Sequence, residues 1–133
     1  MILVWDRSSA DDVVDPTWSE VVRFVDAMDG ARVAFVALLS DSEASESVSV
    51  VHGADGQYVV DYRVDRPEAG ELRLGRLIDT SHADDATYVP IYDGQPGEVE
   101  RRFVVDRRAV DAVLKAALEH GLASVQSAFR WQW

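Results

Sequence analysis

Histidines are the first residues to examine for chemistry, because imidazole exchanges protons and binds metals near neutral pH. The chain has three, His52, His82 and His120, and no cysteine to complete a thiolate zinc site. They are scattered and form no HExxH pattern. SHADD places His82 beside Asp84 and Asp85, which could hold a divalent cation. With 24 acidic residues such neighbours arise by chance, so we expect no metal and no cofactor.

Other patterns that catalysis requires are missing from the sequence. It contains no GxSxG, P-loop or GxGxxG motif. Carboxylate pairs of the glycosidase kind occur throughout so acidic a chain, and nothing singles out one pair. Arginine pairs at 101–102 and 107–108 have acidic neighbours, which favours surface ion pairs over an anion site. We therefore expect a protein that is not an enzyme.

Charge is the strongest signal in the composition. The 133 residues carry a formal net charge of −11. Residues 1–61 hold 12 acids against 3 arginines, a balance of −9, and the remainder holds 12 acids against 10 bases, or −2. Such a field repels nucleic acid and anionic lipid, and it attracts a basic protein. An acidic surface that only maintains solubility is the alternative.

Length and hydropathy predict one domain spanning residues 1–133. No segment approaches the roughly 20 apolar residues of a membrane span, and MILVW has no basic flank of the signal-peptide type. Together with the absence of cysteine, this predicts a cytoplasmic protein.

Two helices are expected near the ends of the chain. Thr17 and Glu20 match a capping box before a stripe of apolar residues that Gly30 can end. Asp106 is placed to cap a second helix, which His120 and Gly121 would close.

Strands are expected mainly between these helices. Residues 32–39, RVAFVALL, are nearly all apolar, which is typical of a central strand covered on both faces. Further strands are expected at 1–5, 47–52, 57–64, 71–78, 87–92 and 101–105, with turns at GADG, RPEAG and DGQPGE. After a connection at LASVQ, a last strand would place Phe129, Trp131 and Trp133 on one side, as core or as an interface anchor. The fold class is α+β, a mainly antiparallel sheet of about six strands with two amphipathic helices packed on it.

The last third of the chain resembles a known family. A strand ending in FVV, the helix DRRAVDAVLKAALEHG and a terminal WQW resemble the first-numbered Imm family of bacterial polymorphic-toxin immunity proteins. The resemblance covers roughly residues 87–133 and includes the W-x-W motif at Trp131 and Trp133. It implies an α+β protein that binds and neutralises a secreted toxin, often a deaminase, encoded beside it.

Charge and expected exposure, rather than the resemblance, indicate which residues would meet the partner. An acidic protein can occupy the basic groove with which a nucleic-acid deaminase or nuclease holds phosphate. The expected partner-binding residues are loop acids, namely Asp41, Glu43, Glu46, Asp84, Asp85, Asp93 and Glu98. A generic acidic partner-binding or regulatory domain is the main alternative, and a small-molecule enzyme is the third.

Overall fold

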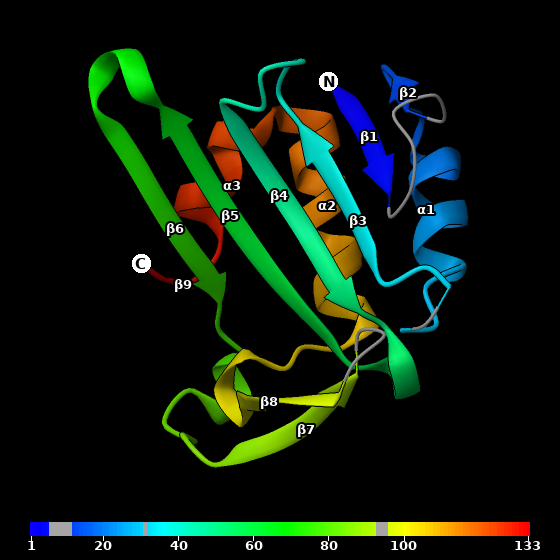
Figure 1. Ribbon diagram of the computed structural model, residues 1–133, viewed down its shortest axis with the longest axis vertical. Helices are drawn as coiled ribbons and strands as arrows, with labels where there is room; N and C mark the ends of the chain where they lie inside the picture. Colours follow the sequence, from blue (N-terminus) through cyan, green and yellow to red (C-terminus); the bar gives the residue numbers. More distant parts are fainter. Residues whose placement is uncertain (6–11, 31, 93–95) are drawn as a thin grey trace.

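The protein is built on one large antiparallel sheet, shown in Figure 1. The computed structural model describes residues 1–5, 12–30, 32–92 and 96–133. Seven strands lie in the order β2-β1-β3-β4-β5-β6-β9, and β7 and β8 form a separate two-stranded sheet. The strands are β1 (Ile2–Trp5), β2 (Val13–Val14), β3 (Phe35–Leu39), β4 (Glu46–His52), β5 (Tyr58–Arg66), β6 (Glu71–Leu77), β7 (Tyr88–Tyr92), β8 (Pro96–Glu100) and β9 (Trp131–Gln132). This confirms the predicted α+β class.

Both predicted helices form, with the N-terminal caps that the sequence indicated, but α1 ends at Asp26 with Ala27 as its C-terminal cap and does not reach Gly30. In α1 (Trp18–Asp26), the Thr17 hydroxyl accepts from the Glu20 N–H while the Glu20 carboxylate accepts from the Thr17 N–H. In α2 (Arg107–His120), the Asp106 carboxylate accepts from the Ala109 N–H at 2.9 Å. These bonds satisfy amide groups that the first turn of a helix leaves without partners.

The core lies between the helices and one face of the sheet. Figure 1 shows α2 and α3 (Leu122–Ala128) behind the central strands, and α1 packs against α2. Alternate strand residues point into this layer and are fully buried with the apolar stripes of α1 and α2: Leu3, Val36, Leu38, Val48, Val50, Val60, Tyr62, Val21, Val25, Val110, Val113 and Leu114. A second cluster joins the β7–β8 sheet to the end of β6 and includes Ile78, Ile91, Val99 and Phe103.

The strand predicted at 101–105 is wrong. The strand β8 covers Pro96–Glu100, whose first three residues were expected to belong to the turn DGQPGE, and Arg101–Phe103 form a single 3-10 turn. Val105 makes an isolated bridge to Tyr58. Pro96 fits the beginning of β8 because a proline without an N–H is tolerated at the first residue of an edge strand.

The predicted connection at LASVQ is also wrong, because these residues begin α3. Leu122 and Val125, one helical turn apart, are its buried side chains. The last strand is therefore only Trp131–Gln132, and Phe129 precedes it instead of sharing it with the tryptophans. Within the described ranges, no helix has the length and apolar character needed to cross a membrane.

Candidate functional site

The β7–β8 sheet covers one end of the second face of the sheet, where Val59 joins the cluster of Ile91 and Val99 and where Val51 packs against it. No described helix or strand covers the rest of this face. It is turned toward the viewer in Figure 1, opposite α2 and α3. We call the uncovered part the open face and define it by the side chains of Phe35, Ala37, Leu39, Ser47, Ser49, Asp61, Arg63, Asp65, Leu72, Leu74 and Arg76, which alternate along β3 to β6 with residues of the helix-covered face. The prediction that residues 32–39 are covered on both faces is wrong for Phe35 and Leu39, which are only partly buried on this face, although Ala37 between them is buried.

The open face is concave because small residues meet in register across its middle strands. Ala37 lies opposite Ser49, and Leu39 lies opposite Ser47, which in turn faces Arg63. The short side chains of Ala37, Ser47 and Ser49 form the floor of a hollow of about 490 Å³, and Phe35 and Leu74 also line it. We call this feature the central hollow. Its lining combines apolar and hydroxyl side chains with Glu43 and with Asp61, Arg63 and Asp65, which are held in ion pairs. This lining suits a protein side chain better than a reaction that needs unpaired, convergent acids and bases.

The charges of β5 and β6 on the open face are largely matched. Arg76 donates to both carboxylate oxygens of Asp61, at 2.7 and 3.0 Å, and Arg63 donates to Asp65 at 2.6 Å. The Asp61 carboxylate, through these hydrogen bonds, raises the pKa of the Arg76 guanidinium. Neither ion pair leaves a side chain activated for catalysis, because each charged group is neutralised by its partner.

The acidic loop after β3 adds negative charge at the rim, and no basic side chain of the described ranges forms an ion pair with Asp41 or Glu43. Asp41 accepts hydrogen bonds from the Ser45 hydroxyl at 3.0 Å and from the N–H groups of Glu43 and Ser45. The Ser45 hydroxyl is the main cause of a lowered pKa at Asp41, so this carboxylate stays ionised at neutral pH. Glu43 is exposed and lines the central hollow. Two of the predicted partner-binding residues thus lie together beside the hollow.

Glu46 lies elsewhere, although it belongs to the same acidic stretch. As the first residue of β4 it points toward the helices, and its side chain is only 13% exposed. It accepts from the Tyr62 hydroxyl at 2.5 Å and pairs with Arg66, which also binds Glu71. Glu46 therefore belongs to a structural network on the covered side of the sheet.

Asp84, Asp85 and Glu98 belong to β8 or to the segment before β7, which lie at the other end of the large sheet from the loop of Asp41 and Glu43 (Figure 1). Asp84 and Glu98 are exposed. Asp85 accepts from the Thr87 hydroxyl and N–H, and the hydroxyl is the main cause of its lowered pKa. Asp93 lies outside the described residues. The seven predicted acids therefore do not form one site.

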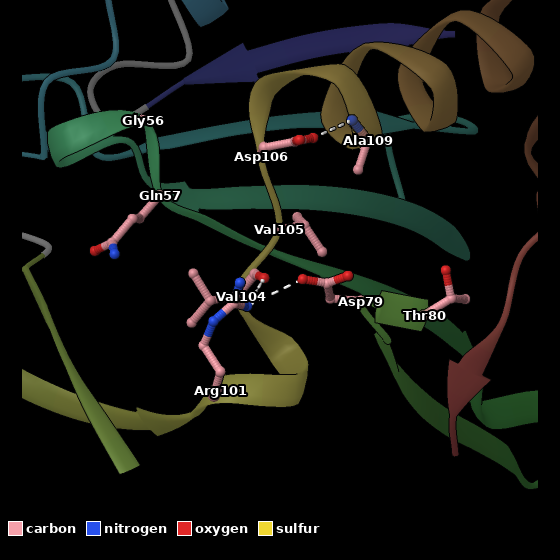
Figure 2. Close-up of a pocket in the computed structure, with 9 residues that line it drawn as sticks. All are labelled: Gly56, Gln57, Asp79, Thr80, Arg101, Val104, Val105, Asp106 and Ala109. Carbon is pink, nitrogen blue, oxygen red and sulfur yellow. Dashed lines mark hydrogen bonds and ion pairs between the residues drawn. The ribbon is translucent and has the colours of Figure 1, made fainter. Parts of the chain in front are cut away.

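A separate pocket of about 260 Å³ lies beside the start of α2 (Figure 2). Arg101 donates to Asp79 at 3.0 Å and to the Val104 carbonyl at 2.8 Å. Asp79 also contacts Nδ1 of His82 at 3.1 Å, so His82 pairs with Asp79 instead of Asp84 or Asp85. An Asp–His pair can support catalysis when the imidazole also activates a nucleophile. Within the described part of the chain, no hydroxyl group hydrogen-bonds to His82, and no three histidine or acidic residues gather as metal ligands.

The two tryptophans of W-x-W have different environments. Trp131 is 8% exposed and donates from Nε1 to the Val125 carbonyl at 2.9 Å, which fixes it in the core. Trp133 is 44% exposed and lies over Gly75, where an added Cβ would come within 2.9 Å of its ring. The Arg73 guanidinium lies 4.2 Å from the Trp133 ring centroid. Trp131 is thus structural, and Trp133 is partly accessible.

The sequence did contain a signal for the open face. An apolar run in which both alternating sets of side chains are hydrophobic indicates burial on both sides. In the described chain, Val36 and Leu38 on one side of β3 are fully buried, whereas Phe35 and Leu39 on the other side are only partly buried. The comparisons add no relative to this picture, since models of protein families, curated proteins and solved structures all gave no match.

Proposed function

We propose that this protein is an immunity-type inhibitor, which neutralises a basic toxin by covering it with the open face. The observation that carries the proposal is the uncovered central hollow, apolar along β3 and edged by Asp41 and Glu43. Apolar surface left uncovered on a folded protein marks an interaction site when it forms a contiguous patch. The resemblance of residues 87–133 to toxin-immunity proteins supports the choice of a toxin as the partner.

The net charge of −11 favours a basic partner and supports fast association with it. A toxin that acts on nucleic acid needs a positive groove for phosphate, and an acidic surface placed over that groove blocks the substrate. Neutralisation by this route needs no catalytic group. It needs an interface of roughly 1,600 Å². The rest of the open face would therefore have to contribute surface beside the central hollow.

Filling the hollow is the most direct test. Ser47→Phe places a ring on the open face without changing charge, and we expect at least a hundredfold loss of affinity for the basic domain of the adjacently encoded toxin. Ser47→Ala is the matched control, because it preserves the hollow. Affinity would be measured by calorimetry, and protection by growth rescue in cells that produce the toxin. Equal binding by both variants would place the interface elsewhere.

The acidic rim can be tested separately. We expect Glu43→Arg to slow association several-fold at low salt and to make the association rate less dependent on salt. Asp84→Arg makes the same charge change at the far end of the sheet and should have a smaller effect. If both variants slow association equally, steering comes from total charge and not from this rim.

A generic partner-binding domain would use the same hollow, so gene order and the growth-rescue assay separate it from a toxin inhibitor. A small-molecule enzyme would depend on the pocket of Figure 2, whose lining residue Asp79 is also paired with His82. Turnover of a metabolite that is lost in His82→Ala would favour that third function.

A further inference from the structure

Over residues 71–75, the outer edge of β6 has no strand beside it among the described residues. β6 runs over residues 71–77, but β9 pairs only with Arg76 and Leu77. β5 and β6 pair one to one without a bulge, so this edge has the regular form to which another strand can add.

The backbone groups of Leu72 and Leu74 face this free edge. The Ile78 N–H donates to the Arg130 carbonyl at 3.0 Å, so it points away from β5. In an antiparallel strand, every second residue directs its N–H and C=O toward the same neighbour. Counting back in twos from Ile78 gives Arg76, which pairs with Gln132, and then Leu74 and Leu72.

The side chains at the edge define the strand that would fit. Leu72 and Leu74 are 61% and 58% exposed and belong to the open face, and Leu74 also lines the central hollow. Arg73 and Glu71 point to the other face. Residues directly opposite one another in paired strands contact each other. A complementary strand therefore has apolar residues opposite the two leucines, an acid opposite Arg73 and a base opposite Glu71.

A second copy of this chain fits the edge poorly. In paired strands, residues that lie directly opposite one another have their side chains on the same face of the sheet. Antiparallel pairing of β6 with β6 of a second copy therefore has few possible registers. Leu72 against Leu74 of the copy puts Arg73 directly against Arg73, a like-charge pair. Leu72 against Leu72 pairs Leu74 with Gly70, which has a φ of 64° and belongs to the turn. Leu74 against Leu74 requires the outer side of Arg76, which Gln132 occupies.

We propose that β6 accepts an extended segment of the partner protein as an additional antiparallel strand, apolar opposite Leu72 and Leu74 and acidic opposite Arg73. The proposal rests on the proposed function, since the segment belongs to the protein that the open face binds. The added strand would cover both leucines and extend the floor of the interface from the central hollow to the sheet edge. Backbone hydrogen bonds would supply binding, and the alternating side chains would supply selectivity.

The direction of β9 allows the edge to be tested in the full chain. β9 is antiparallel to β6, with Trp131 opposite Leu77 and Gln132 opposite Arg76. A tetrapeptide appended after Trp133 would therefore pass Leu74, Arg73, Leu72 and Glu71 in turn. The sequence valine–glutamate–valine–lysine matches these four positions, and glycine–serine–glycine–serine is the control of equal length.

We expect the matched extension to slow amide hydrogen exchange at Leu72 and Leu74 at least tenfold relative to the glycine–serine extension. Exchange at Tyr62, in the centre of the sheet, serves as the internal reference. Equal exchange at Leu72 and Leu74 in the two proteins would show that the edge does not accept a strand, and would overturn the proposal.

The matched extension should also compete with the partner. For the toxin domain that the native protein neutralises, we expect at least tenfold weaker binding by the matched extension than by the glycine–serine extension. Leu74→Pro should weaken binding similarly, because proline lacks the N–H that points away from β5, while the hydrogen bonds to β5 remain. Leu74→Ala is the control, because it shortens the side chain and keeps that N–H. Unchanged affinity in the matched extension and Leu74→Pro would overturn the strand and leave the proposed function intact. If the native protein itself binds no basic toxin, the proposed function fails and the strand proposal fails with it.

Discussion

The two faces of the sheet use the same strands in different ways. On β3, Leu38 points to the helices and is fully buried, whereas the adjacent Leu39 lies on the open face and is only partly buried. On β5, Tyr62 packs in the core beside Asp61, which forms an ion pair on the other side. Within the described chain, the helices pack on one face of the sheet, whereas the apolar residues of the open face have no layer packed on them. Stability and recognition are therefore carried by alternate residues of the same strands.

Leu38 and Leu39 provide the sharpest test of this difference, since residue type and strand are the same. We expect Leu38→Ala to lower the free energy of unfolding by about 2 to 5 kcal/mol, because it leaves a cavity in the core. Leu39→Ala should cost less than about 1 kcal/mol, since it removes a partly exposed side chain. Urea denaturation of both variants measures the comparison. Similar costs would mean that the open face is packed as tightly as the core.

The covered face also predicts a pH dependence through Tyr62. Burial, together with the hydrogen bond to Glu46, raises the pKa of the Tyr62 hydroxyl to about 12. The folded state thus holds this proton more tightly than the unfolded state, where the pKa is about 10. The resulting stabilisation is fully present below pH 10 and is lost as pH rises from 10 to 12. By linkage it amounts to roughly 2 to 3 kcal/mol.

Tyr62→Phe isolates this contribution from those of other alkaline groups. The difference in unfolding free energy between the native protein and this variant should shrink between pH 10 and 12 and be constant from pH 7 to 9. Tyr88→Phe is the control, because Tyr88 is 65% exposed and should not alter the profile. A difference that does not change above pH 10 would contradict the raised pKa.

Local signals in the sequence predicted most of the covered layer. Capping residues marked α1 and α2, and turn residues marked the β4–β5 and β5–β6 hairpins. Such signals act over a few residues and do not depend on the rest of the fold. The helix α3 was missed because its seven residues bury only Leu122 and Val125, too few to establish a helical period.

The candidate site was harder to predict, because it depends on pairing between distant strands. Ser47 and Ser49 are unremarkable in sequence, and they form a hollow only because register places them beside Leu39 and Ala37. The acidic stretch 41–46 was identified, but alternation along β4 turns Glu46 to the covered side. Charge alone could not separate Glu46 from Glu43.

The smallest expected effect on stability concerns the ion pair of Asp61 and Arg76. Both side chains are more than a third exposed, 34% and 41%, so solvent screens their attraction. We expect Asp61→Asn to change the free energy of unfolding by less than about 1 kcal/mol, measured by urea denaturation. The same change leaves Arg76 without its counter-charge on the open face, and a basic partner should then associate more slowly. Arg76→Gln, which leaves Asp61 without its counter-charge, should speed association. If both variants instead lower stability by several kcal/mol and leave association unchanged, the open face is a structural surface and the contrast between the two faces fails.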